Sequence, residues 1–279
     1  MKNILVYLEC ASGNANVLAQ ACGLAKTHGA RMTGVITPAV SEPNWAMVAD
    51  GAISQGVVAN LEFVVLESAD GALSEFQLAL EKHGLKGDTR VQESPSHAVA
   101  EVVTQFARRH SLAVIAQSPA SRMRFGGQEL PDHLVLNSGR PVLVVPEIPT
   151  APAGRHIMVG WDGSREAARA VNDAMPLLQM AEKVTVIMVN PVPSIISKSA
   201  KPGAGIIQHL SANGVVASID EEDPASMTRE NVILSRASDL GIDMLVVGAY
   251  STPRYRELIF GGVTRHLMHE MTVPILFSH

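Results

Sequence analysis

Glycine, hydroxyl and arginine residues between positions 244 and 265 have types and spacing that suit the binding of an anion. Gly248 ends the apolar run 244–247, and the pair Gly261 and Gly262 precedes a helical pattern. A buried strand that ends at a glycine, followed by a glycine pair at a helix start, points backbone N–H groups above the sheet edge, where an anion is favoured. The loop lacks the G-K-[ST] of a Walker A motif and the pattern G-x-G-x-x-G. Ordinary turn chemistry is the alternative explanation of its glycines.

The elements that would position this loop occur twice in the chain. The segment HIMVGWDGS at 156–164 repeats NILVYLECA at 3–11 in register, so Asp162 corresponds to Glu9. In both halves short apolar runs alternate with helical patterns, which predicts an α/β fold with a doubly wound, five-stranded parallel sheet in each half. A repeat of this length indicates two copies of one domain rather than a solenoid.

Proline residues mark the boundary between the two copies. Positions 146, 149 and 152 are proline, and such a stretch is stiff and non-helical. We therefore expect a first domain at 1–146, a proline-rich linker at 147–154 and a second domain at 155–279. In the second domain, Asp223-Pro224 is expected to open the third helix, because a cap residue is followed there by a first-turn proline.

The spacing of the glycine loop resembles the phosphate loop of the universal stress protein (UspA) family, which reads G, two residues, G, nine residues, G and then Ser or Thr. Gly248 matches the first glycine and Gly261 the third, whereas Ser251 stands in place of the second glycine and Gly262 in place of the Ser or Thr. The resemblance covers nearly the whole chain in two copies, and the chain is identified on it as a tandem two-domain member. It implies a Rossmann-like strand order of 3-2-1-4-5 in each half, with ligands at the carboxyl ends of strands 1 and 4.

By this resemblance the second half is the site for ATP or another adenine nucleotide, with Mg²⁺ as a candidate companion ion. Gly160 and Asp162 would lie at the ribose, and the backbone of Val189 would meet the adenine. The residues that would line the phosphates are Gly248, Ser251, Gly261, Gly262, Val263 and Thr264. Three arginines are candidate phosphate partners, namely Arg254, Arg256 and Arg265. The residues alone also allow Asp162 to act only as a helix cap and the arginines to be solvated surface.

The first half lacks the residues that this site needs. Glu9 replaces Asp162, and Ala116 replaces Gly248. Glu129 and Asp132 would put negative charge where a phosphate would sit, and Pro131 would cut into the helix there. We therefore expect no cofactor in the first domain, which would pair with the second as an intramolecular pseudo-dimer. A homodimer of the whole chain is a further candidate assembly.

The composition excludes several classes of partner. A formal net charge of −5 argues against non-specific binding to nucleic acid. No apolar run approaches the ~18 residues that a membrane-spanning helix needs. The N-terminal residues MKNILVYLEC lack the apolar core and cleavage site of a signal peptide. We therefore expect a cytoplasmic protein without a nucleic-acid or membrane partner.

The remaining reactive residue types form no recognisable catalytic or metal pattern. Cys10 and Cys22 have neither metal nor redox spacing, which favours two reduced thiols. His266 and His269 lie three residues apart with no third ligand nearby in sequence. Since no nucleophile–base set or carboxylate pair has a supporting context, the chain is not expected to be an enzyme. The leading expectation is a stress-response protein that binds a nucleotide in its second half; the alternative is a scaffold or interaction protein without nucleotide.

Overall fold

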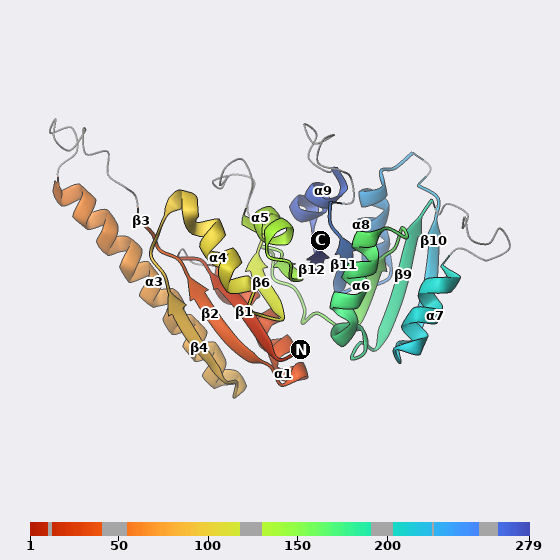
Figure 1. Cartoon of the computed structure of the whole chain (residues 1–279), viewed down its shortest axis with the longest axis horizontal. Helices are drawn as coiled ribbons and strands as arrows, with labels where there is room; N and C mark the ends of the chain where they lie inside the picture. Colours follow the sequence, from red (N-terminus) through yellow and green to blue (C-terminus); the bar gives the residue numbers. More distant parts are fainter. Residues whose placement is uncertain (11–12, 41–54, 118–129, 191–202, 225, 251–261) are drawn as a thin grey trace. The chain divides into compact units, whose positions relative to one another are not determined.

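A computed structural model describes residues 1–10, 13–40, 55–117, 130–190, 203–224, 226–250 and 262–279 (Figure 1). The chain divides into two compact units, Met1–Ala116 with Ser121–Ser138 and Gln117–Ala120 with Gly139–His279. Each unit has alternating strands and helices around a mostly parallel sheet, so the predicted α/β class is confirmed. Among the described helices, none has both the length and the hydropathy that crossing a bilayer requires.

The first unit is built around a parallel sheet with the strand order β4-β2-β1-β6. Its elements are, in chain order, β1 (Asn3–Leu8), α1 (Asn14–His28), β2 (Arg31–Ile36), β3 (Ala39–Val40), α3 (Gln55–His83), β4 (Gly87–Val91), β5 (Ser94–Pro95), the 3₁₀-helix η1 (Ser96–Ala98), α4 (Val99–Ala107), β6 (Leu112–Ala116) and α5 (Leu130–Asn137). The central strands β1 and β6 are apolar and buried, whereas β4 at the edge carries Asp88 and Arg90. Buried central strands and a charged edge are what a parallel sheet between helices requires.

The second unit repeats this plan. Its elements are β7 (Val142–Val145), β8 (His156–Gly160), α6 (Arg165–Leu178), β9 (Lys183–Val189), α7 (Ala204–Ala212), β10 (Ala217–Glu222), α8 (Arg229–Asp239), β11 (Met244–Gly248), α9 (Gly262–Glu270) and β12 (Ile275–Ser278). The strands follow the order β10-β9-β8-β11-β12, and the four pairs within that series are parallel. Helix α6 packs on β8, β11 and β12, while α8 packs on β9 and α9 (Figure 1). The order reverses between β8 and β11, which places the switch point of the sheet at their carboxyl ends.

The strand register of the two units follows the sequence repeat. In the first unit Ile4 of β1 pairs with Leu112 of β6, and in the second unit Ile157 of β8 pairs with Met244 of β11. Residues 3–11 and 156–164 were aligned in the same way from the sequence alone. Residues with equal repeat positions therefore occupy equal places at the two switch points.

The last strand of the first half, β7, pairs with the last strand of the second half, β12. Strand β7 belongs to the second unit, where it pairs antiparallel with β12, so Val144 lies opposite Ile275. Gln117 also belongs to the second unit, because its amide donates hydrogen bonds to the carbonyl oxygens of Met268 and His269 at 2.8 and 2.9 Å. The division between the units precedes β7, upstream of the linker expected at 147–154.

The start of helix α8 differs from its prediction. Helix α8 begins at Arg229, after Thr228, instead of at Asp223-Pro224. The described part of helix α5 is Leu130–Asn137, and Pro131 is its second residue. The shift of α8 matters for function, because it puts an arginine at a helix start beside the switch point.

Candidate functional site

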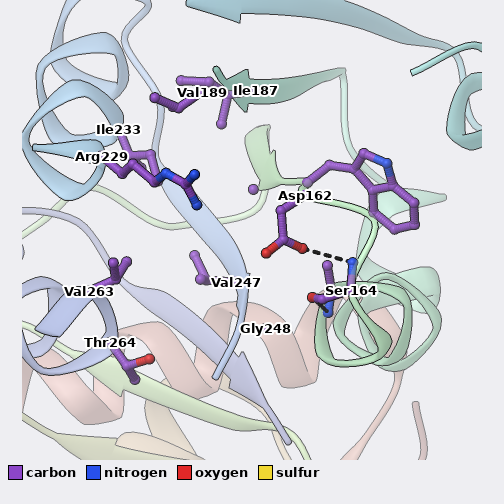
Figure 2. Close-up of a pocket in the computed structure, with 13 residues that line it drawn as sticks. Asp162, Ser164, Ile187, Val189, Arg229, Ile233, Val247, Gly248, Val263 and Thr264 are labelled. Carbon is purple, nitrogen blue, oxygen red and sulfur yellow. Dashed lines mark hydrogen bonds between the residues drawn. The ribbon is translucent and has the colours of Figure 1, made fainter. Parts of the chain in front are cut away.

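A cavity of about 130 Å³ lies in the second unit at the carboxyl ends of β8 and β11 (Figure 2). It is lined by Gly160, Trp161, Asp162, Ser164, Ala167, Ile187, Val189, Arg229, Ile233, Val247, Gly248, Val263 and Thr264. These residues come from the ends of three neighbouring strands and from the first turns of α6, α8 and α9. A parallel α/β sheet commonly binds its ligand in the crevice at this place.

The turn after β8 fixes the carboxylate of Asp162 at the mouth of the cavity. Its Oδ1 atom accepts a hydrogen bond from the backbone N–H of Ser164 at 2.9 Å, and Gly163 between them takes a φ of 77°. The hydroxyl of Ser164 in turn accepts from the N–H of Ala167 at 3.1 Å, so Ser164 is the N-cap of α6. Asp162 thus supports the turn with one oxygen. Within the described part of the chain no hydrogen bond uses its Oδ2, which is free to accept one from a ligand.

Close backbone packing explains the glycine at the end of β11. A Cβ atom on Gly248 would lie 2.4 Å from the carbonyl carbon of Glu166 and 2.5 Å from the nitrogen of Ala167. Real Cβ atoms do not approach backbone atoms so closely, so only glycine lets β11 meet the first turn of α6. The close approach of β11 to α6 therefore requires glycine at position 248, whether or not Gly248 also contacts a ligand.

One wall of the cavity is apolar. Ile187 is 1 % exposed, Val247 7 % and Ile233 8 %, and Val189 at the end of β9 is half-buried. These side chains come from β9, β11 and α8 and face the space above the sheet (Figure 2). Such a wall suits a flat, largely apolar ring rather than a fully hydrated group.

The opposite wall is the start of α9. Val263 is exposed, whereas Thr264 is 4 % exposed and its hydroxyl accepts a hydrogen bond from the N–H of Tyr250 at 3.3 Å. No acidic residue stands in the first turn of α9. The unpaired N–H groups and the dipole of a helix start favour an anion. The ring of Tyr250 lies edge-on to that of His279, and Tyr250 is not among the lining residues of the cavity.

Arg229 is the first residue of α8 and enters the cavity from the side facing Asp162. Figure 2 shows its guanidinium and the Asp162 carboxylate pointing toward one another. Both side chains are exposed, and within the residues that the structure describes neither belongs to an ion pair. Together they give the cavity a hydrogen-bond acceptor on one side and a planar cationic donor on the other.

The structure brings together six of the residues predicted for the site, which are Gly160, Asp162, Val189, Gly248, Val263 and Thr264. Gly262 is the first residue of α9 and Arg265 lies one residue beyond Thr264, and neither lines the cavity. Four of the predicted residues lie outside the described residues, namely Ser251, Arg254, Arg256 and Gly261.

Sequence reasoning missed the contribution of α8. Arg229 and Ile233 lie one helical turn apart, so both belong to the face of α8 that meets the cavity. The apolar spacing of Val232, Ile233 and Ala237 is the signal that could have found this face. With the helix start placed at Asp223, that face had no reason to be read as part of the site.

The corresponding place in the first unit has different chemistry. Tyr7 stands where the second unit has Gly160, and Asn14 stands where it has Ala167. The carboxamide of Asn14 is buried and exchanges hydrogen bonds with the backbone N–H and carbonyl of Glu9 at 2.9 and 3.0 Å. The side chain of Asn14 at the start of α1 thus binds the backbone of Glu9 just after β1. Asp132, which was expected to put negative charge where a phosphate would sit, is only 4 % exposed.

Comparison with solved structures identifies the fold. No protein-family model and no curated protein matches the chain. A universal stress protein from Archaeoglobus fulgidus DSM 4304 superposes with a TM-score of 0.72 at 14 % identity, over 98 % of this chain and 95 % of that one. A candidate universal stress protein from Pseudomonas aeruginosa UCBPP-PA14 gives 0.62 at 17 % identity, over 100 % and 93 %. The chain has the universal stress protein fold.

The same fold extends to a protein of another kind. The cytoplasmic domain of a prokaryotic cation chloride cotransporter matches with a TM-score of 0.51 at 14 % identity, over 99 % of this chain and 94 % of that one. At such identities the likeness establishes the fold and not the activity. The function of this chain has to be argued from its own cavity.

Proposed function

We propose that the second unit binds an adenine nucleotide, with ATP as the leading candidate, and that the chain is a cytoplasmic stress-response protein of the universal stress protein family. The observation that carries the binding proposal is the cavity at the switch point between β8 and β11, with Asp162 and Arg229 on opposite sides. The stress-response role rests on the likeness of fold alone.

Each wall of the cavity matches one part of a nucleotide. The Oδ2 atom of Asp162 would accept hydrogen bonds from the ribose hydroxyls. The apolar wall of Ile187, Val189 and Ile233 would hold the base. The start of α9 would receive phosphate oxygens, because its first turn carries no competing carboxylate.

We propose binding without hydrolysis. Among the described residues lining the cavity only Asp162 and Arg229 are ionisable, and one oxygen of Asp162 is already held by Ser164. Among the described residues no group of three His, Cys, Asp or Glu side chains is placed to hold a metal ion. A Mg²⁺ ion would therefore arrive with the phosphates, as it does in many nucleotide sites, and keep several waters.

Native mass spectrometry of the freshly purified protein, followed by calorimetric titration with ATP, tests the proposal. We expect a mass increment of one adenine nucleotide per chain, or saturable heat on titration of the emptied protein. Asp162→Ala is the matched variant, and it should weaken binding at least several-fold. A chain that carries no nucleotide and releases no heat with ATP would overturn the proposal in favour of the scaffold alternative.

A further inference from the structure

The one cationic side chain among the described residues that line the cavity is that of Arg229. It comes from α8, and α8 packs on β9 and on α9. Arg229 is thus carried by the helix that stands between the strand end at Val189 and the helix start at Val263. Figure 2 shows its guanidinium at the edge of the cavity, pointing toward the carboxylate of Asp162. A ligand that spans the cavity from the base wall to α9 would pass this group.

Helix stability does not account for an arginine at this position. A cation in the first turn of a helix opposes the helix dipole, which favours acidic residues there. Within the described chain Arg229 has no ion-pair partner that would offset this effect, in contrast to Arg236 on the same helix, which pairs with Asp220 and Glu222. No ion pair within the described residues therefore accounts for Arg229, and its place at the cavity suits a ligand with negative charge.

We infer that Arg229 is the phosphate-recognising side chain of this site, so that the site selects a nucleotide over the corresponding nucleoside. The inference rests on the proposed nucleotide-binding function and adds the residue that reads the charge. A guanidinium suits this task, because its fork of N–H donors matches two phosphate oxygens at once and it stays charged at any physiological pH. Asp162 on the other side accepts from the neutral ribose hydroxyls, so the two residues recognise different parts of the same ligand.

Titrations of adenosine, AMP and ATP into four proteins test the inference. The proteins are the parent, Arg229→Gln, Arg229→Lys and the control Lys183→Gln. Lys183 is exposed and begins β9, at the end of the strand away from the cavity, so its variant loses the same charge without touching the site. Trp161 lines the cavity and one other tryptophan, Trp45, occurs in the chain, so in a Trp45→Phe background indole fluorescence reports occupancy independently of heat.

We expect the parent to bind AMP and ATP at least tenfold more tightly than adenosine. Arg229→Gln should lose about ten- to a hundredfold in nucleotide affinity, as expected for a hydrogen bond to a charged group, and leave adenosine binding unchanged. Arg229→Lys should retain part of the nucleotide affinity. The melting temperature of ligand-free Arg229→Gln should equal or exceed that of the parent, because the unfavourable interaction with the helix dipole is removed.

Three results would overturn the inference while leaving nucleotide binding intact. These are equal affinity of the parent for adenosine and AMP, an equal loss of adenosine and nucleotide binding in Arg229→Gln, and the same loss in Lys183→Gln. A parent protein that binds neither adenosine nor ATP would contradict the proposed function itself, and the inference with it.

Discussion

The carboxylate of Asp162 accepts the backbone N–H of Ser164 at 2.9 Å, so the side chain that faces the cavity also builds the turn in front of α6. The two tasks use different oxygens and can be separated by substitution. Asp162→Asn keeps an acceptor for Ser164 but replaces the other oxygen by an NH₂ group, whereas Asp162→Ala removes both.

We therefore predict that the free energy of unfolding of Asp162→Asn in urea lies within about 0.5 kcal/mol of that of the parent. For Asp162→Ala it should be lower by about 0.5–1.5 kcal/mol. Both variants should bind ATP several-fold more weakly, because the ribose acceptor is lost in each. If Asp162→Asn kept full ATP affinity, the residue would serve only the turn.

The contact between Gly248 and Glu166 gives a prediction about stability. A Cβ at position 248 meets the backbone of α6 at 2.4–2.7 Å, so Gly248→Ala should destabilise the chain by about 1–3 kcal/mol through overpacking. Gly262→Ala is the matched control, because its Cβ meets no described atom within 4 Å and it stands at a helix start. Equilibrium unfolding in urea measures the free energy of unfolding of both variants. Equal stability of Gly248→Ala and the parent would contradict the close approach.

The imidazole of His156 gives a prediction about pH. Burial lowers its pKa below the ordinary value of 6.5, and the charge of Lys183 acts in the same direction, while Asp243 and a backbone hydrogen bond to Leu240 oppose them. The unfolded chain therefore takes up the proton first, so stability from the neutral ring is present above about pH 6.5 and is lost as the pH falls below it.

His156→Gln should flatten this dependence. The free energy of unfolding of the parent should fall more steeply from about pH 6.5 to pH 5 than that of the variant. Burial also lowers the pKa of His28, which is present in both proteins and cancels in the difference curve. Parallel curves for parent and variant would show that His156 does not titrate differently on folding.

The phosphate loop expected between Gly248 and Thr264 gives a prediction about affinity. Ser251→Gly with Gly262→Ser restores the glycine and hydroxyl pattern that nucleotide-binding universal stress proteins share. The new hydroxyl at the start of α9 can donate to a phosphate, which is worth about 1.5–3 kcal/mol. ATP affinity of the double variant should rise at least several-fold in calorimetric titration. An unchanged affinity would mean that this loop does not contact the phosphates.

Much of the fold could be predicted because its signal is local and repeated. Apolar runs such as Ile4 to Leu8 recur as buried strands, and the two copies keep one register. The pairing of β7 with β12 could not be predicted, since both are short runs of buried apolar residues whose composition carries no strand direction.

The candidate site divides in the same way. Asp162 follows β8 and Gly248 ends β11, where the sequence changes visibly from an apolar run to polar or glycine residues. Ile187 and Ile233 are isoleucines like many core residues, so their residue type does not predict that they line a cavity. Arg229 was missed because Asp223-Pro224 is a stronger start signal in the sequence than Thr228, which precedes α8 in the structure.

Calorimetric titration of the intact chain with ATP, with one carboxylate removed from each half in turn, tests the central claim most directly. The account predicts one site per chain, weakened at least several-fold by Asp162→Ala and unaffected by Glu9→Ala at the corresponding position of the first unit. Two equivalent sites, or a loss of binding in Glu9→Ala equal to that in Asp162→Ala, would contradict it.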